Sequence, residues 1–407
     1  MKVSDAHLAP PPQTADTAPM RCLALAAPGT LNLVAAECHA LSLKVVQVDA
    51  DGVHLELNWK EIAFALVQLR IASRLLLHLG VWFADDAESL YKAALHVDWA
   101  EWLDLRSTFG IFATGDVVSP GVRENGRKFM GLTDMRFVNV RVKDAIADEM
   151  MRRFGKRPDV DRDDPVVAVM VRGRQGKWAF YLDLADPPLT MRGVCEAKVT
   201  APLRENVAAA MVDLSGWRGR ERLLDPMCGS GTIVIEAACK ILGIAPGCTR
   251  SFACERWPHH GKAMRKWLDA EREKAVAKAK TALATGQLDV VASDIDPHAV
   301  QAARRNVEAA GLDALIDVQL RDARELPPQP VGTLIVTNPP YGERMGGADV
   351  ASLYAQLGQA WRSQGVAKAC VLSGSEAFAP AFNWRQLSRA HLNNGGIDVE
   401  LLELVPD

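Results

Sequence analysis

The chain has 407 residues, of which 49% are hydrophobic and 24% are charged, and its formal net charge at pH 7 is −3. This length predicts two or three domains, each large enough to form its own core. The net charge excludes a protein that is basic over its whole surface, so any surface for nucleic acid must be local. No apolar run approaches the ~20 residues needed to span a bilayer.

The cysteines and the start of the chain indicate a cytoplasmic protein. Residues 1–20 are rich in Pro and Ala and lack the basic and apolar regions of a signal peptide, so we expect a disordered tail. The eight cysteines are scattered without a Cys-x-x-Cys pair, which indicates reduced thiols and argues against a zinc site. No metal and no membrane association are expected.

Residues 21–186 are predicted to form an α+β module, with a domain boundary near Pro187-Pro188. Local periodicity and turn residues predict its elements. In chain order these are a helix near 31–41, strands at 44–49 and 53–57, a helix at 61–69, a strand at 73–80, a helix at 87–95, a strand that turns into a helix at 137–148, and a hairpin of 166–172 with 177–183.

From about residue 190 to 407 strands alternate with helices, which predicts an α/β domain with a doubly wound, mostly parallel sheet of seven strands. The polar helix at 262–283 is expected to be a solvated insertion, and an Asn394-Gly395-Gly396 turn predicts a closing antiparallel hairpin. The expected strands are 222–224, 290–293, 316–320, 333–337, 369–372, 387–392 and 397–404.

A glycine-bearing loop follows the first strand of this domain and leads into a helix. Glycines let a ligand approach the backbone closely, and the helix start offers free N–H groups. The loop is neither a P-loop, since no Lys follows Gly231, nor a Gly-x-Gly-x-x-Gly loop. By itself it is also compatible with an ordinary tight turn. The candidate residues are Asp225, Pro226, Met227, Cys228, Gly229, Ser230, Gly231 and Thr232.

Acidic residues follow the next two strands: Asp294, before Ile295, and Asp322, before Ala323. Ligands of open α/β sheets bind outside the carboxyl ends of the strands. Asp294 is therefore placed to accept from ribose hydroxyls, and Asp322 from an adenine amino group. Anionic strand ends would repel a pyrophosphate, so the pattern favours an adenosine without phosphates. S-adenosylmethionine meets that description.

The tetrapeptide Asn338-Pro339-Pro340-Tyr341 follows the fourth strand and predicts the reaction. An exocyclic amine of a base is a poor nucleophile, so a site must hold its N–H groups with acceptors and aim the nitrogen at the methyl group. The Asn338 side-chain oxygen and a carbonyl beside Pro339 can accept these N–H groups, and Tyr341 can stack on the base. The predicted chemistry is methyl transfer to an exocyclic nitrogen without a metal.

These motifs resemble those of the class I S-adenosylmethionine-dependent RNA guanine-N2 methyltransferases, most closely the bacterial 23S ribosomal RNA enzymes with an N-terminal THUMP domain. The resemblance implies a ferredoxin-like plus THUMP module over residues 21–186, with the THUMP core at about 66–184, and a Rossmann-like methyltransferase domain over 190–407. One departure is Val194-Cys195 after Arg192-Gly193, where the family commonly has an aromatic and a basic residue.

The resemblance also implies roles for the candidate residues. The loop from Asp225 to Thr232 would line the methionine end of the cofactor, Asp294 and Asp322 would hold its adenosine, and Asn338 to Tyr341 the target amine. The N-terminal module would dock structured RNA, with ribosomal RNA favoured over transfer RNA, and a monomer is expected. The basic residues that could contact RNA, or else form a solvated helix face, are Arg123, Arg127, Lys128, Arg152, Arg153, Lys156 and Arg157.

Other functions remain open at this point. The same tetrapeptide serves DNA adenine-N6 and protein glutamine-N5 methyltransferases, and a transfer RNA guanosine could replace the ribosomal one. A non-catalytic RNA-binding assembly factor could keep the fold as a scaffold. The resemblance of the N-terminal module to an RNA-binding domain favours RNA, and the retained Asp225, Asp294, Asp322 and Asn338 argue against a scaffold.

Overall fold

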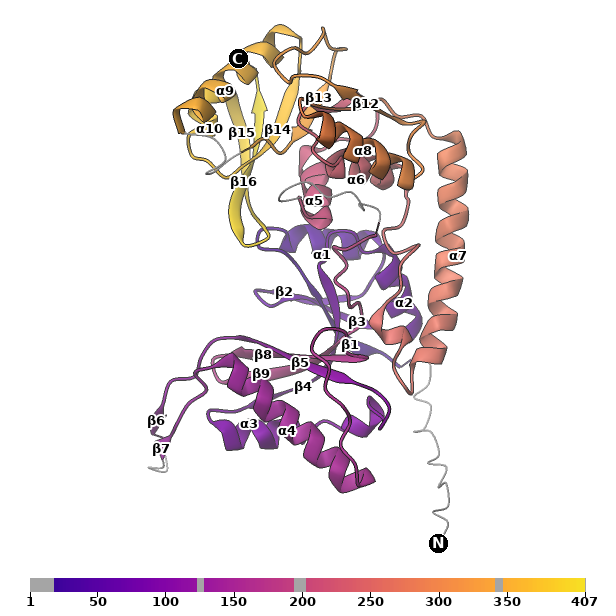
Figure 1. Ribbon diagram of the computed structural model, residues 1–407, viewed down its shortest axis with the longest axis vertical. Helices are drawn as coiled ribbons and strands as arrows, with labels where there is room; N and C mark the ends of the chain where they lie inside the picture. Colours follow the sequence, from indigo (N-terminus) through magenta and orange to yellow (C-terminus); the bar gives the residue numbers. More distant parts are fainter. Residues whose placement is uncertain (1–17, 123–127, 194–202, 341–346, 407) are drawn as a thin grey trace.

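The computed structural model describes residues 18–122, 128–193, 203–340 and 347–406, and it contains a seven-stranded sheet in each half of the chain (Figure 1). The N-terminal sheet has the order β2-β3-β1-β4-β9-β8-β5, in which all neighbours are antiparallel except β5 and β8. The pairing of β4 with β9 joins two α+β units into one sheet. Its elements are β1 Met20–Leu25, α1 Leu31–Ala40, β2 Val45–Asp49, β3 Gly52–Leu57, α2 Trp59–Gln68, β4 Arg74–Phe83, α3 Ala87–Ala94, β5 Phe109–Gly115, β6 Gly121–Val122, β7 Lys128–Phe129, α4 Met135–Phe154, β8 Val167–Arg174 and β9 Lys177–Asp183.

Local sequence signals explain several helix ends in this half. Asn58 accepts hydrogen bonds from the backbone of α2 while Glu61 reaches back to the Asn58 N–H, which is a complete capping box. Gly155 ends α4 in the left-handed conformation, at φ 70°. The predicted helix 31–41 and the hairpin 166–172 with 177–183 are confirmed.

The prediction that residues 137–148 begin as a strand is wrong, because the whole segment lies inside α4. Alternating valines suggested a strand, yet Val140 is 50% exposed while Val138, Val142 and Ile146 are buried. This spacing of four residues is that of one helix face. Asp134 caps the helix by accepting from the Arg136 N–H at 2.8 Å.

The predicted doubly wound sheet of the C-terminal half is confirmed. Its order is β12-β11-β10-β13-β14-β16-β15, parallel from β12 to β14 and closed by the antiparallel β15–β16 hairpin. The reversal of winding lies at β10, between β11 and β13. Its elements are α5 Glu205–Ser215, β10 Leu223–Asp225, α6 Thr232–Leu242, α7 Gly261–Thr285, β11 Val290–Asp294, α8 Pro297–Ala309, β12 Ile316–Leu320, β13 Leu334–Thr337, α9 Gly347–Ser363, β14 Lys368–Ser373, α10 Phe378–Phe382, β15 Arg385–Asn394 and β16 Ile397–Val405.

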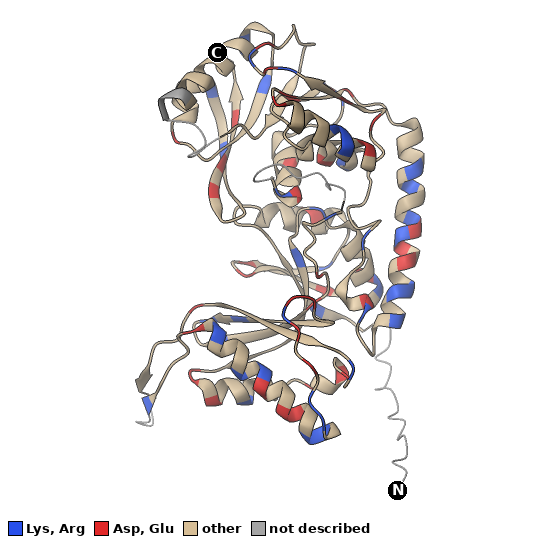
Figure 2. Cartoon of the chain, in the orientation of Figure 1, with Lys and Arg blue, Asp and Glu red and all other residues tan. Residues whose placement is uncertain are grey.

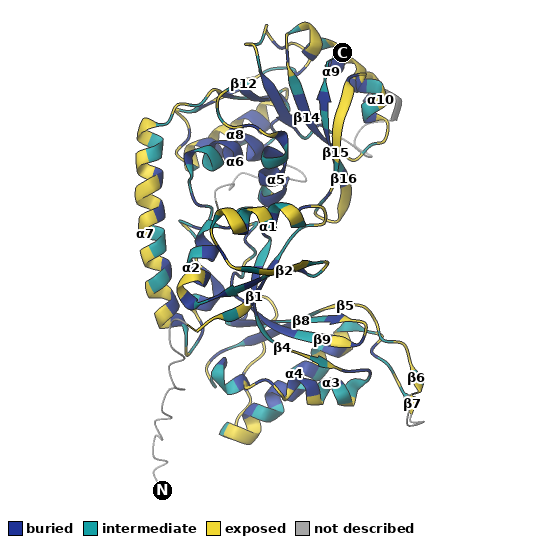
Figure 3. Ribbon diagram, turned by 180° about the vertical axis from the view of Figure 1, so that it is seen from behind, coloured by how far each residue is buried: buried dark blue, intermediate teal, exposed yellow. Residues whose placement is uncertain are grey.

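Helix α7 is less solvated than predicted. It runs along one side of the molecule from the C-terminal sheet to the N-terminal half, with its outer face exposed (Figures 1 and 3). Met264, Leu268 and Ala275 are buried in the hydrophobic core of the N-terminal half, where α7 packs against α2. Two short elements, η1 Trp99–Glu101 and η2 Ala253–Glu255, also lie at this junction.

A buried polar cluster joins the two halves. Arg70, which follows α2, and Arg192 both form ion pairs with Glu236 on α6, the first at 2.8 Å between Nη1 and Oε2. The Arg70 guanidinium also donates to the carbonyl of Ile244. Because these charges are removed from water, the interface depends on their mutual pairing.

In the described part of the chain, no helix is both long enough and apolar enough to cross a bilayer. The seven cysteines in this part are free thiols.

Candidate functional site

The sheet order brings the candidate side chains to one edge of the C-terminal sheet. β10 lies between β11 and β13, so Asp225, Asp294 and Asn338 stand at the carboxyl ends of three neighbouring strands. β12 is next to β11 and places Asp322 beyond Asp294. The topology therefore gathers residues from four separate stretches of sequence at the reversal point, where open sheets bind ligands.

Asp225 is almost completely buried, with 1% of its surface exposed. Its Oδ1 accepts a hydrogen bond from Thr337 Oγ1 at 2.6 Å and one from the Met227 N–H at 3.3 Å. Its Oδ2 is buried without a partner among the described residues. Burial raises the pKa of this carboxyl to about 7. An unsatisfied buried carboxylate oxygen is costly unless a ligand supplies a donor.

The glycine loop turns tightly in front of β11. Gly229 and Gly231 have φ of 53° and 83°, and Gly231 is the N-cap of α6. The Cys228 N–H donates to the Ser293 carbonyl at 2.9 Å, which ties the loop to β11. The Asn306 side chain donates to the Ser230 carbonyl at 3.0 Å and ties it to α8. Left-handed backbone favours glycine at these two positions.

The remaining loop residues line or support the turn. Pro226, Cys228, Ser230 and Thr232 are buried, whereas Met227 is half-buried. Burial raises the pKa of the Cys228 thiol well above its ordinary value, so this cysteine stays protonated. The Ser230 and Thr232 hydroxyls are 3.3 Å apart.

Asp294 holds the loop and the turn before α8. Its Oδ2 accepts from the Gly229 N–H at 2.9 Å and its Oδ1 from the Asp296 N–H at 3.0 Å. Asp296 in turn caps α8, in which Pro297 is the first residue. Ile295 projects its side chain into solvent, with 63% exposed. Asp294 thus offers a hydrogen-bond acceptor to a nucleoside, and Ile295 beside it offers an apolar contact.

The Asp322 carboxylate already has a partner, the neighbouring Arg324. Its carboxylate accepts from the Arg324 backbone N–H at 2.8 Å and from the Arg324 guanidinium at 2.5–3.0 Å. These hydrogen bonds lower the pKa of Asp322. Ala323 is buried, and its carbonyl accepts from the Trp361 indole N–H at 2.9 Å. A base amine at Asp322 would share or replace the Arg324 contact.

Asn338 follows β13 directly and presents an unsatisfied acceptor. Its Oδ1 is buried without a hydrogen-bond partner among the described residues. Pro339 is buried, and the Pro340 carbonyl accepts from the Tyr354 hydroxyl of α9 at 2.8 Å. This bond and the two prolines fix the backbone after Asn338. Tyr341 lies outside the described residues.

The described residues among those predicted to contact RNA belong to the N-terminal half, which lies apart from the C-terminal sheet (Figure 2). On α4, Arg152 pairs with Glu149, and Arg153 pairs with Glu149 and Asp98. Arg157, just beyond α4, pairs with Asp148. Lys128 and Lys156 are exposed, whereas Arg123 and Arg127 lie outside the described residues, as do Val194 and Cys195.

Three site residues were missed by sequence reasoning. Thr337 holds Asp225, Asn306 holds the loop, and the buried Ser293 hydroxyl has no partner in the described parts of the chain. Thr337 could have been found, because it directly precedes Asn338 at the end of the predicted strand 333–337. Asn306 could not, since its contact depends on how α8 packs.

Three family models match successive segments of the chain. One described as an RMKL-like methyltransferase domain matches residues 192–403, a THUMP domain model matches 84–183, and an RlmL ferredoxin-like domain model matches 21–76. The ribosomal RNA large subunit methyltransferase K/L of Psychromonas ingrahamii is 34% identical over 336 residues, which cover 82% of this chain and 43% of that protein. The chain thus spans less than half the length of this curated relative.

Solved structures share the arrangement of both halves. SMU.472, crystallised as a complex with SAH, is 26% identical with a TM-score of 0.82, over 96% of this chain and 99% of that one. A protein from Listeria monocytogenes described as a predicted N6-adenine-specific DNA methylase is 25% identical with a TM-score of 0.81, over 96% and 97% of the two chains.

Proposed function

The chain belongs to the RMKL-like methyltransferase family, and from this premise we propose that it transfers a methyl group from S-adenosylmethionine to the exocyclic N2 amine of a guanosine in structured RNA, with 23S ribosomal RNA as the substrate. Asn338 carries the proposal. Its buried side-chain oxygen lacks a donor among the described residues, at the edge of the sheet where the cofactor would bind.

The residues at the strand ends fit S-adenosylmethionine. The unsatisfied Asp225 Oδ2 would receive a donor from the ammonium at the methionine end. Asp294 would accept from the ribose hydroxyls, and the exposed Ile295 would cover one face of the adenine. Asp322, freed in part from Arg324, would accept from the adenine amino group. The complex of SMU.472 with SAH, the product of methyl transfer, supports this choice of cofactor.

When bound, the cofactor supplies an electrophilic methyl group, and the chain positions the amine. Asn338 Oδ1 would accept one N–H of the guanine amine, which directs the nitrogen lone pair toward the methyl group. The bond from Tyr354 to the Pro340 carbonyl holds the backbone in place for this contact. A guanine must leave its stack to reach this site.

Adenine N6 in DNA is the second candidate, because the similar Listeria protein is described as a methylase of that type. The THUMP match over residues 84–183 favours RNA instead. Ribosomal RNA is favoured over transfer RNA by the description of the curated relative as a ribosomal RNA large subunit methyltransferase. We further propose a cytoplasmic monomer.

Methylation by the purified protein tests the proposal. The chain is incubated with labelled S-adenosylmethionine and either protein-free 23S ribosomal RNA, transfer RNA or duplex DNA, and the products are digested to nucleosides for mass spectrometry. N2-methylguanosine in the ribosomal RNA is expected. N6-methyladenine in DNA, or N2-methylguanosine confined to transfer RNA, would overturn the substrate assignment. Cofactor binding without any transfer would support the assembly-factor alternative.

A further inference from the structure

The β15–β16 hairpin projects beyond the edge of the C-terminal sheet that carries Asn338. The last pair of β14 with β16 joins Ser373 to Glu400, whereas β15 and β16 stay paired as far as Asn394 and Ile397. At about 3.3 Å per residue, the hairpin extends ~10 Å past the end of β14. Because β15 is parallel to β13, its turn lies on the same side of the sheet as Asn338. The hairpin reaches α1 of the N-terminal half (Figures 1 and 3).

Gly29, in the turn before α1, touches the backbone of this hairpin. Its φ is 84°, and a Cβ added there would overlap the His391 carbonyl oxygen and lie 3.3 Å from Leu392 Cα. An α-hydrogen of Gly29 therefore points at that carbonyl, which is a contact that any side chain would prevent. To relieve the overlap of an added Cβ, the two backbones would have to separate by ~1–2 Å. Gly29 thus permits the close approach of the two halves.

The start of α5 links the hairpin to the N-terminal half a second time. The Asn394 side-chain oxygen accepts from the backbone N–H of Arg204, the N-cap of α5, at 3.3 Å. Two residues further on, the buried Asn206 side chain donates to the Ile71 carbonyl of the N-terminal half at 3.4 Å. The hairpin is therefore braced directly at Gly29 and indirectly through α5.

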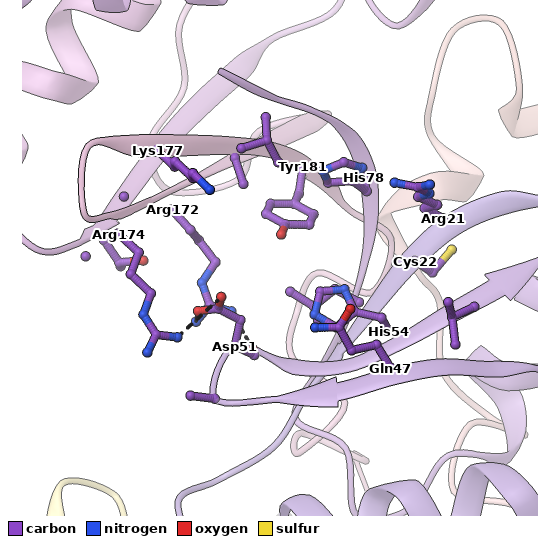
Figure 4. A pocket seen from close by; sticks show the side chains of 18 of the residues that line it. Arg21, Cys22, Gln47, Asp51, His54, His78, Arg172, Arg174, Lys177 and Tyr181 are labelled. Atoms are coloured by element: carbon purple, nitrogen blue, oxygen red, sulfur yellow. Dashed lines mark hydrogen bonds and ion pairs between the residues drawn. The ribbon is translucent and has the colours of Figure 1, made fainter. Parts of the chain in front are cut away.

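The two halves carry different parts of the proposed reaction. The N-terminal half has a cationic cleft of about 1010 Å³, which Arg172, Arg174 and Lys177 help to line (Figure 4). Under the proposed function this half holds the RNA, whereas Asn338 belongs to the other half. A misplacement of ~1 Å can lower a rate by ~10²-fold, so the spacing of the halves decides whether the guanosine reaches Asn338 in a productive position.

We propose that the β15–β16 hairpin is a spacer that sets the distance between the N-terminal half and Asn338, with Gly29 and Asn394 as positioning residues. This role rests on the proposed function, because it requires RNA that is bound by one half and methylated in the other. Neither residue belongs to the strand ends assigned to the cofactor, so both act through the placement of the RNA. The neighbouring Asn393 side chain bonds within the hairpin, to Asp398 and to the Gly396 N–H.

Gly29→Ala tests the spacer through the rate of methyl transfer by the full chain. Gly365→Ala is the matched control, because Gly365 has φ 80° and also faces a carbonyl oxygen, that of Gln329, but at 3.7 Å from an added Cβ. With saturating 23S ribosomal RNA and S-adenosylmethionine, the single-turnover rate should fall ~10–100-fold in Gly29→Ala and by less than about twofold in the control. The affinities for both substrates should not change. Loss of stability alone would lower the melting temperature but not this rate.

Double electron–electron resonance measures the spacing without any reaction. Nitroxides are placed at exposed His39 on α1 and Leu387 on β15, as unnatural amino acids because the chain has eight cysteines. Gly29→Ala should lengthen the mean distance by ~1–2 Å, and Gly365→Ala should leave it unchanged. If Gly29→Ala does not fold, Asn394→Ala provides the test. It should lower the single-turnover rate about threefold, while Asn393→Ala keeps the wild-type rate.

Four results would overturn the spacer: a wild-type rate in Gly29→Ala, an equal loss in Gly365→Ala, a lower rate at an unchanged nitroxide distance, or a loss confined to the affinity for RNA or cofactor. Equal rates of Asn394→Ala and Asn393→Ala would do the same for the second contact. The proposed function fails separately. If the wild type does not methylate RNA while Gly29→Ala still lengthens the distance, the function is contradicted and the hairpin keeps its role as a spacer.

Discussion

Asn338 combines two properties that rarely occur together: its side-chain oxygen is buried, and it has no donor among the described residues. If it accepts the N–H of the target amine, Asn338→Ala should lower the rate of methyl transfer by ~10²–10³ or more, as loss of a preorganised catalytic hydrogen bond does. Affinity for S-adenosylmethionine should change little. Single-turnover rates and calorimetry measure the two quantities, with Asn393→Ala on the exposed hairpin as control. A variant with wild-type turnover would remove Asn338 from the reaction.

The buried position of Asp225 lowers the stability of the folded protein near neutral pH. Its pKa rises from the ordinary 3.8 to about 7 in the folded state, so between these values the unfolded chain is ionised while the native carboxyl holds its proton. The unfolded state then binds fewer protons, and stability falls as pH rises from about 4 to 7. Asp225→Asn lacks this titration.

The unfolding free energy of Asp225→Asn relative to wild type should therefore increase by ~2 kcal/mol between pH 5 and pH 8. Chemical denaturation at both pH values measures this difference. Asp317→Asn, at an exposed side chain of β12, is the control. The same variant should bind S-adenosylmethionine more weakly, since it lacks the carboxylate for the ammonium. A difference that does not depend on pH would show that Asp225 ionises normally.

At the scale of elements, the loop between β10 and α6 links local backbone shape to ligand binding. Gly231 has φ 83°, and an added Cβ would lie 3.4 Å from Ala303 Cβ on α8. Gly155 has a similar φ of 70° with nothing within 4 Å of an added Cβ. Each Gly→Ala change should cost ~1–2 kcal/mol of stability. Only Gly231→Ala should also weaken cofactor binding, by about tenfold. Equal cofactor affinities of the two variants would contradict a role of the loop.

Helix α7 is a polar helix with a narrow buried stripe. Leu268 is completely buried in the N-terminal core, whereas Val276 on the same helix is 47% exposed. Leu268→Ala should lower the unfolding free energy by ~2–5 kcal/mol, because it leaves a cavity. Val276→Ala should change it by less than ~0.5 kcal/mol. Urea denaturation measures both changes. If α7 were the solvated insertion that its composition suggests, the two variants would have the same unfolding free energy.

At the scale of the whole molecule, the two halves share one core. Phe252, Trp257, Met264 and Leu268 of the C-terminal half are buried in the cluster of the N-terminal half. The His260 ring stacks on that of Trp59 in α2, with 5.0 Å between the ring centroids, and lies tilted against that of Trp102 at 4.9 Å. The halves are therefore continuous in packing, although the family models divide them.

A fragment of residues 190–407 should consequently be much less stable than the full chain. It would expose this apolar surface to water and remove Arg70, which leaves Arg192 as the ion-pair partner of Glu236. Thermal unfolding of the fragment, alone and mixed with residues 18–189, measures the effect. A fragment with the melting temperature of the full chain would show that the methyltransferase half is independent.

What the sequence determined by itself is which residues stand at the strand ends and the order of elements. Glycines, capping residues and acids act through local backbone geometry, so Asp225 to Thr232, Asp294 and Asn338 could be predicted as candidates from the sequence alone. Hydrophobic periodicity wrongly predicted a strand at the start of residues 137–148, where β-branched valines alternate on a helix. Only packing distinguishes a buried valine from an exposed one there.

Only the tertiary structure decided which contacts join distant segments. The hydrogen bond from Thr337 to Asp225, the one from Asn306 to the Ser230 carbonyl and the burial of α7 side chains in the N-terminal core all depend on how elements far apart in sequence pack together. The basic residues of α4 illustrate the reason. In the sequence they are part of a run of cations, whereas in the fold Arg152, Arg153 and Arg157 pair with the carboxylates of Glu149, Asp98 and Asp148, because only packing brings those acids within reach.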